Sequence, residues 1–193
     1  MQTEIRADGT MQIIGYVNTT GRESRVLKDV TGSFVETILP GAFKRALERN
    51  RAVMMLLNHN DSRVLAKQED GTLKLCEDSI GLRVEAIITD KEVIEKAKQK
   101  KLIGWSFGMY VTDEEKTPGA DGITKRTVKE LEIEEVSLID DRMSPCYTAT
   151  SIETRSDSER MNEKRAREDA CEVDNREDPL LEYKKRLEKL KNA

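Results

Sequence analysis

Apolar clusters separated by turn residues run from about residue 10 to residue 150 of this 193-residue chain, and then they stop. Residues 156–178 are almost wholly polar, and their only aliphatic side chains are alanine, valine and one methionine. Such a segment cannot bury enough apolar surface to offset the ~1–2 kcal/mol that ordering each residue's backbone costs. The pattern therefore predicts one folded domain over residues 1–150 and a charged, flexible or loosely helical tail over residues 151–193.

The last part of the tail has apolar residues at a helical spacing, at positions 180, 183, 187 and 190. They form a single stripe, of about the length at which an isolated helix is marginal in water. A solvated helix and a short docking helix both fit this pattern.

Strands dominate the predicted domain. Strands are indicated by β-branched and aromatic runs, by period-2 alternation and by bounding Gly or Pro residues. They are expected at 11–17, 33–39, 52–57, 73–75, 82–86, 103–111 and 124–139, with turns or loops at 58–62, 78–81 and 117–122. Amphipathic segments predict two short helices, at 40–49 and 91–101. Many strands, two helices and no βαβ rhythm indicate an α+β or mainly β, barrel-like domain.

Composition excludes several classes of protein. Lys and Arg total 33 against 37 Asp and Glu, so no basic excess indicates nucleic-acid binding. No stretch approaches the ~20 apolar residues of a transmembrane helix, and the first 20 residues lack the apolar core of a secretory signal, so a reducing cytoplasm is expected. Cys76, Cys146 and Cys171 are widely spaced and odd in number, which predicts neither a disulfide scaffold nor a metal site.

His59 is the only histidine in the chain. It follows the apolar run 52–57 and opens a polar turn, so we expect its ring at the edge of the core, half exposed. An imidazole with a pKa near 6.5 suits a general base at neutral pH, and no other side chain here does so without a large shift. A turn residue without a catalytic role fits the same position, but if a histidine base exists it is His59.

Ser106 is the candidate nucleophile that stands out, within Gly104-Trp-Ser-Phe-Gly108. In a strand, Ser106 points to one face while Trp105 and Phe107 point to the other. The flanking glycines allow a substrate backbone to approach closely and leave N–H groups for a developing oxyanion. The pattern is not the GxSxG elbow of α/β-hydrolases. A strand serine between core aromatics is the alternative interpretation.

A serine–histidine pair also needs a third group to hold the imidazole. The strand over 129–139 alternates until Glu134 and Glu135 stand together, after which the apolar residues move from odd to even positions. This switch predicts a bulge or a barrel bend. Simple alternation puts Glu135 on the face that Leu131 and Ile133 bury, where an acid needs a partner or a raised pKa. A glutamate at the sheet rim paired with a lysine fits as well.

Seven blocks occur in the order expected of the prohead maturation proteases of tailed bacteriophages, which the chain resembles over roughly residues 10–150. These blocks are MQIIGYV at 11–17, FVETILPGAF at 34–43, LNH at 57–59, GTLKL at 71–75, GLRV at 81–84, WSFG at 105–108 and EVS at 135–137. The resemblance implies a serine endopeptidase that trims scaffold and capsid segments inside assembling proheads, in the cytoplasm of the host bacterium. It also implies a fold related to the herpesvirus assembly proteases, a mainly antiparallel β-barrel surrounded by a few helices.

The same resemblance implies the roles of the site residues. Ser106 is then the nucleophile, His59 the general base, and Glu135 the acid that holds the imidazole, with Glu134 as the nearby alternative. The expected partners are phage capsid and scaffold proteins, with no nucleic acid, membrane, metal or other cofactor. Both a monomer and a homo-oligomer are left open.

Two further hypotheses stay open from the sequence. The domain fits a catalytically silent scaffold or shell-binding module, and Cys76 or Cys146 fits a thiol hydrolase. The adjacent Asp140 and Asp141 fit a charged turn better than a metal site. Because flexible, charged segments are ready protease substrates, we also expect the enzyme to trim itself beyond Thr150.

Overall fold

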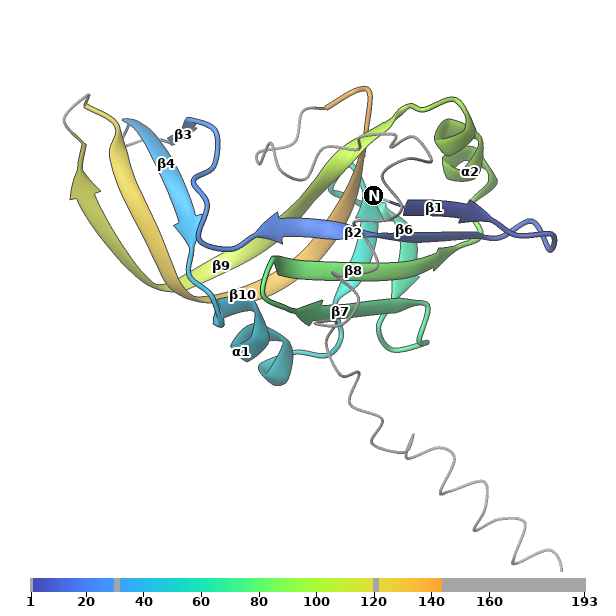
Figure 1. Cartoon of the computed structure of the whole chain (residues 1–193), viewed down its shortest axis with the longest axis horizontal. Coiled ribbons are helices and arrows are strands. Elements are labelled where there is room, and N and C mark those ends of the chain that lie inside the picture. The colour runs from blue at the N-terminus through green and yellow to red at the C-terminus, as the bar shows by residue number, and fades with distance from the viewer. Residues whose placement is uncertain (1, 30–31, 120–121, 144–193) are drawn as a thin grey trace, which may run out of the picture.

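The computed structural model of the chain describes residues 2–29, 32–119 and 122–143, which form two β-sheets and two short helices (Figure 1). One sheet is antiparallel and has the strand order β1-β2-β8-β7. Its strands are β1 (Gln2–Ile5), β2 (Met11–Thr19), β7 (Leu73–Glu77) and β8 (Gly81–Ile88). The other sheet has the order β3-β4-β10-β5-β6, with β9 paired along β10. Its strands are β3 (Leu27–Asp29), β4 (Gly32–Ile38), β5 (Met54–Leu57), β6 (Asn60–Lys67), β9 (Leu102–Pro118) and β10 (Thr124–Asp140).

The predicted mainly antiparallel, closed barrel is wrong. Among the described residues both sheets are open, and no strand of one pairs with a strand of the other. The second sheet is mixed, because one edge of β10 is divided between two parallel neighbours, β4 at 124–128 and β5 at 135–138. Period-2 alternation shows which face of a strand is buried, but it is the same in a barrel and in two stacked open sheets. The order in which the strands pair therefore could be known only from the tertiary structure.

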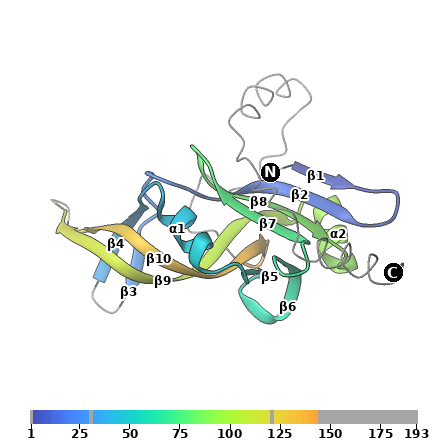
Figure 2. The same ribbon diagram turned by 90° about the horizontal axis from the view of Figure 1, so that it is seen from below.

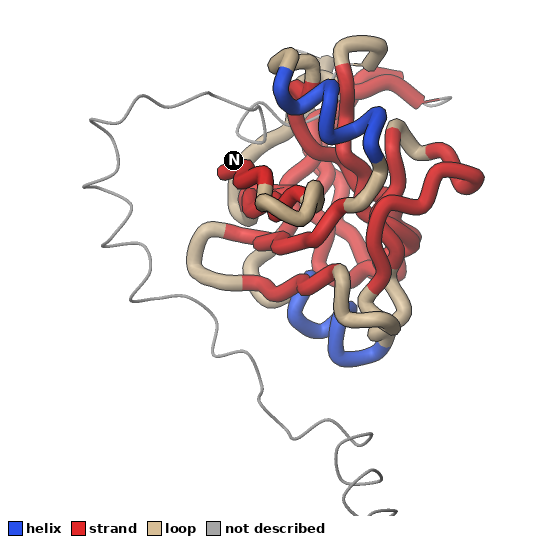
Figure 3. Tube along the Cα trace, turned by 90° about the vertical axis from the view of Figure 1, so that its right-hand side faces the viewer, coloured by secondary structure: helices blue, strands red, loops and turns tan. Residues whose placement is uncertain are grey.

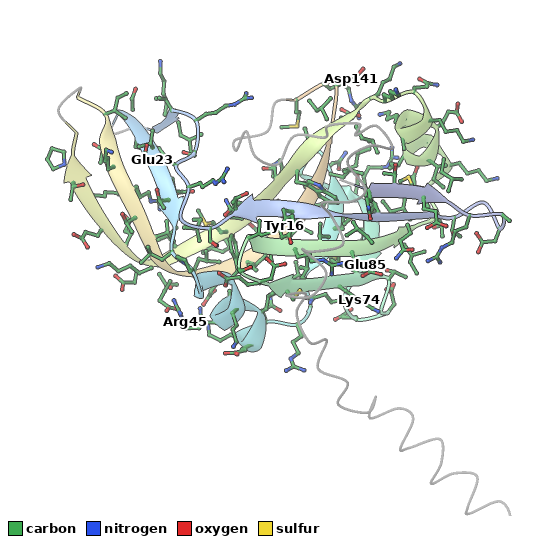
Figure 4. The ribbon with its side chains drawn as sticks, viewed as in Figure 1. Tyr16, Glu23, Arg45, Lys74, Glu85 and Asp141 are labelled. Carbon is green, nitrogen blue, oxygen red and sulfur yellow. The ribbon has the colours of Figure 1, made fainter. Side chains whose placement is uncertain are left out.

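The two sheets pack face to face over one core, with the four-stranded sheet above β5, β6 and the near parts of β9 and β10 in Figure 2. Met11 and Ile13 of β2 and Val84 of β8 contribute to this core. The core also contains Trp105 of β9, whose indole lies against β2: a Cβ on Gly15 would come 2.8 Å from its Nε1. Residues that alternate with these buried ones, among them Tyr16 and Glu85, are partly exposed on the opposite face. Tyr16, Lys74 and Glu85 lie along that sheet in Figure 4.

The two helices lie at opposite ends of the strand body (Figure 3), so the few helices expected around a barrel do not ring it. Helix α1 (Ala42–Arg49) connects β4 to β5, and its N-terminus is capped by the Glu77 carboxylate, which accepts from the N–H groups of Gly41 and Lys44. Helix α2 (Lys91–Lys98) precedes β9 and is capped by Asp90. Neither of these helices, the two that the described residues form, has the length and apolar content needed to span a membrane.

Most predicted elements are confirmed. The strands and the hairpin expected around residues 78–81 are present, as are both helices, although the second ends at Lys98. Strands β1, β3 and β6 were not predicted, and the expected turn over 58–62 shrinks to Asn58 and His59 because β6 begins at Asn60. The boundary expected near residue 150, the tail and its C-terminal helix lie outside the described residues.

Candidate active site

His59 lies in a two-residue turn between β5 and β6, where Leu57 pairs with Asn60. Asn58 and His59 have φ values of 55° and 57°, as the two central residues of a type I′ hairpin turn do. Asparagine is common in this left-handed region, but for most other L-residues the conformation costs roughly 1–2 kcal/mol. His59 therefore holds a strained backbone that the surrounding contacts must stabilise.

Asn58 anchors this turn to the end of β10. Its backbone N–H donates to the carbonyl of Leu138 at 3.0 Å, and its side-chain amide donates to Asp140 Oδ1 at 2.8 Å. The Asp140 backbone N–H donates back to Asn58 Oδ1 at 3.0 Å. These three hydrogen bonds hold the turn against the sheet. They thereby fix the backbone position from which the His59 side chain extends.

Asp140 is a buried anion and not the charged turn residue that the sequence predicted; the turn begins at Asp141. Lys96 Nζ lies 2.6 Å from its Oδ2, and Arg142 also binds the carboxylate. Burial acts to raise the pKa of Asp140, but hydrogen bonds from Arg142, Lys96 and Asn58 outweigh it and hold that pKa well below its usual value. The carboxylate therefore stays charged and available to Asn58.

The imidazole of His59 contacts Glu135, the residue that the sequence suggested as a third group of the site. Nδ1 of His59 lies 2.6 Å from Oε1 of Glu135, and the two side chains are 34% and 9% exposed. The hydrogen bond to Glu135 raises the pKa of His59 above its ordinary value, while partial burial opposes the shift. An ionised carboxylate only accepts hydrogen bonds, so Nδ1 carries a proton and neutral His59 has its lone pair on Nε2.

A bulge in β10 puts Glu135 in this position. The register against β9 slips between Ile133, which pairs with Met109, and Glu135, which pairs with Gly108. The bulge was predicted from the sequence, but the expectation that Glu135 shares a face with Ile133 is wrong, because the extra residue, Glu134, moves Glu135 to the opposite face. An acid that simple alternation assigns to the core thus lies beside the histidine.

Glu134 occupies a different place from Glu135. Its Oε1 accepts a hydrogen bond from Tyr110 at 3.3 Å, and within the described residues no hydrogen bond joins it to His59. Both carboxylates lie over Gly108, where an added Cβ would come 3.0 Å from Glu135 Oε1 and 3.3 Å from Glu134 Oε2. The glycine of the WSFG block thus leaves the room that the Glu135 side chain occupies.

Ser106 lies on β9 directly opposite Ser137 of β10, and Ser137 is also opposite Leu56 of β5. Trp105 and Phe107 belong to the core side, so Ser106 points away from the core, as predicted. Register partners on neighbouring antiparallel strands have Cβ atoms roughly 4.5–5.5 Å apart. Ser106 therefore lies one strand spacing from a hydroxyl, that of Ser137, which His59 contacts directly.

The structure thus joins His59 to Glu135 and places Ser106 on the neighbouring strand, on the same face as Glu135. Among the described residues, no hydrogen bond joins the Ser106 hydroxyl to the His59 ring, and Nε2 of that ring makes none either. Chemically, the arrangement can accept a proton at Nε2 and stabilise the resulting imidazolium with the Glu135 carboxylate.

Sequence reasoning missed three contributors to this site, namely Ser137, Asn58 and Met54. Met54 belongs to an apolar run that predicted a fully buried strand, yet it is 38% exposed and pairs with Glu135. For Asn58 and Ser137, the only indication in the sequence was that they are polar residues within the LNH and EVS blocks. The described residues contain no group of three or more His, Cys, Asp or Glu side chains placed to hold a metal ion.

The cysteines proposed for a thiol hydrolase lie elsewhere. Cys76 is on β7 in the four-stranded sheet, opposite Arg83, whereas His59 belongs to the other sheet and contacts Glu135. Cys146 lies outside the described residues. Cys76 is also disulfide-bonded, so a thiol mechanism through it would lack both a free thiol and the one histidine of the chain.

Comparison with known proteins identifies one family. The family model described as caudovirus prohead serine protease matches residues 1–164. A search among curated proteins found no match. The matched range includes the whole candidate site, from Asn58 to Asp140.

Proposed function

Since the chain belongs to the caudovirus prohead serine protease family, we propose that it is an endopeptidase with Ser106 as nucleophile, His59 as general base and Glu135 as the acid that holds the imidazole. The observation that carries this proposal is the 2.6 Å contact between His59 Nδ1 and Glu135 Oε1, with Ser106 on the adjoining strand. A silent scaffold module has no need of such a pair, so the contact favours the protease over that alternative.

The chemistry follows from the protonation state of His59. Nε2 of the neutral ring takes the proton of the Ser106 hydroxyl as its oxygen attacks the peptide carbonyl, and Glu135 stabilises the imidazolium. The tetrahedral oxyanion is held by backbone N–H groups near Gly104 or Gly108. His59 then gives its proton to the leaving amine, and an acyl-enzyme remains on Ser106. Water, deprotonated by His59, hydrolyses this ester and restores the serine.

The proposed substrates are scaffold and capsid protein segments within the assembling phage head, in the host cytoplasm. An extended peptide that reaches Ser106 lies across the face that also carries Met54 and Tyr110, both exposed. These two side chains offer it an apolar surface on either side of Gly108 and Glu135.

Co-expression with a candidate shell protein tests the proposal. Wild type should cleave the shell protein, whereas Ser106→Ala and His59→Ala should leave it intact, since residues of such a set act as a unit. Ser33→Ala is the matched control, because Ser33 is another half-buried strand serine, on β4 and away from the site. Cleavage by Ser106→Ala at the wild-type rate would exclude Ser106 as nucleophile.

We also propose that the enzyme cuts its own chain beyond Thr150. Incubation of purified wild type and Ser106→Ala, followed by intact-mass measurement, should show a loss of mass in the wild type alone. Equal masses would contradict self-trimming without affecting the proposed site.

A further inference from the structure

Ser137 makes contacts that the proposed mechanism does not require. It is fully buried on β10, opposite Ser106, and its hydroxyl joins the two other members of the site. Its Oγ donates to Glu135 Oε2 at 2.6 Å and accepts the backbone N–H of His59 at 3.0 Å. One side chain thus contacts both the acid and the main chain of the base.

The directions of these hydrogen bonds are fixed by the proton count. The His59 N–H can only donate, so Ser137 Oγ is the acceptor there and its single proton goes to Glu135 Oε2. Glu135 then presents its other oxygen, Oε1, to Nδ1 of the imidazole. The contacts form a closed ring that runs from the His59 main chain through Ser137 and Glu135 to the His59 side chain.

This ring constrains both partners. Glu135 cannot rotate its carboxyl group without losing Ser137, and His59, whose left-handed backbone is strained, gains an acceptor for its N–H. The ring also requires Glu135 to accept at both oxygens, which keeps the proton on Nδ1 and leaves the lone pair on Nε2. Ser137 itself is unsuited to be a nucleophile, because it is buried and its proton is donated to Glu135.

We propose that Ser137 is a positioning residue that sets the tautomer and orientation of His59 by holding Glu135 and the turn together. The expected effect of Ser137 on the reaction rate rests on the proposed function. The expected effect of Ser137 on the tautomer of His59 does not. The single histidine makes this second effect directly measurable, because the ring gives one set of nitrogen resonances.

The experiment compares the imidazole ¹⁵N spectrum above the His59 pKa in wild type, Ser137→Ala and Ser24→Ala. Ser24 is the matched control, since its buried hydroxyl likewise accepts a backbone N–H, that of Glu36, and donates to a carbonyl, that of Arg25. Wild type and Ser24→Ala should show the Nδ1–H tautomer, and Ser137→Ala should gain a population of the Nε2–H tautomer. Ser137→Thr, which keeps the hydroxyl, should restore the wild-type spectrum.

Kinetics provide the second measurement. Ser137→Ala should lower kcat by roughly 10- to 100-fold with KM unchanged, by analogy with the loss seen when the partner that orients a metal-binding histidine is removed. If Ser137→Ala does not fold, Ser137→Cys replaces it with the same expectations, because a thiol is a weak donor. A pure Nδ1–H tautomer in the variant would overturn the proposal.

The two proposals fail separately. A tautomer change in Ser137→Ala together with a wild type that cleaves no more than Ser106→Ala would refute the protease function and support the positioning role. Cleavage that depends on Ser106 together with an unchanged tautomer in Ser137→Ala would do the reverse.

Discussion

Nδ1 of His59 and Oε1 of Glu135 lie 2.6 Å apart, although 76 positions separate the two residues in the chain. The parallel pairing of β5 with β10 makes this contact possible, because it aligns residues 54–57 with residues 135–138, and the turn after Leu57 then binds β10 through Leu138 and Ser137. The Glu134 bulge then turns the Glu135 side chain toward the ring. The contact between His59 and Glu135 thus depends on the pairing of β5 with β10 and on the one extra residue of the bulge.

Glu135→Gln should lower the pKa of His59, since the carboxylate that raises it becomes a neutral amide. The amide both donates and accepts, so the tautomer is no longer held, and kcat should fall by roughly 10⁴-fold, as when the acid of a serine protease triad is replaced by its amide. Titration of the His59 ring by NMR and hydrolysis assays would measure the two effects. Glu134→Gln is the control, and a loss of activity there equal to that of Glu135→Gln would assign the acid to Glu134.

Activity should rise with pH through a transition above 6.5. His59 must be deprotonated to act as a base, and its contact with Glu135 raises its pKa above that value. A pH profile of kcat/KM measures the transition. A midpoint at or below 6.5 would contradict the raised pKa.

Stability should depend on pH in the opposite sense. A histidine whose pKa is raised by folding contributes stability that is fully present below its unfolded pKa of about 6.5, and that is lost as the pH rises through the folded value. The free energy of unfolding should therefore differ more between wild type and Glu135→Gln at pH 6 than at pH 9, as measured with urea. Equal differences at the two pH values would show that the pair does not couple to folding.

Gly108→Ala should damage the site and leave the fold in place. The new Cβ would come 3.0 Å from Glu135 Oε1 and displace the carboxylate from His59. A misplacement of about 1 Å can lower a rate by about 100-fold, so a displacement of a few tenths of an ångström should lower kcat/KM by less than that. Gly15→Ala is a control that should affect the fold and not the site. Its new Cβ meets the buried indole of Trp105 and should destabilise the fold by about 1–3 kcal/mol. The His59 pKa and thermal unfolding, measured in both variants, separate the two effects.

Asp140→Ala should destabilise the protein by about 1–3 kcal/mol, because it removes the hydrogen-bond anchor of Asn58 and one of the two carboxylates that pair with Lys96, which keeps Glu92. Asp141→Ala, which changes an exposed neighbour labelled in Figure 4, should stay within about 0.5 kcal/mol of wild type. Since folding lowers the pKa of Asp140, the contribution of Asp140 is present above about pH 4 and is lost in stronger acid. Chemical unfolding at pH 7 and pH 3 measures both effects. Equal losses of unfolding free energy in Asp140→Ala and Asp141→Ala at pH 7 would contradict the role of Asp140, and an undiminished loss in Asp140→Ala at pH 3 would contradict the pH dependence.

Local patterns were sufficient for the helices and most strands. The apolar spacing of Phe43 and Ala46 predicted α1, and the alternation of Leu82, Val84 and Ala86 predicted β8, because these residues bury one face of their own element. The strand β6 was missed because its first residues are polar and exposed, like those of a loop. The continuous apolar run over 52–57 wrongly predicted that Met54 is buried, because its exposure depends on what covers the other side of β5.

The sequence by itself determined which chemical groups exist. One imidazole, a serine between two aromatics and a strand with adjacent acids made His59, Ser106 and Glu135 or Glu134 the leading candidates, with two cysteines as alternative nucleophiles, since residue type sets pKa and nucleophilicity. Only the tertiary structure decided that Glu135 is the acid that contacts His59 and that Ser137 joins them. It also decided that the sheets are open. The reason is that a side chain's face follows from local geometry, whereas its partners follow from strand order and register, which depend on residues far away in the chain.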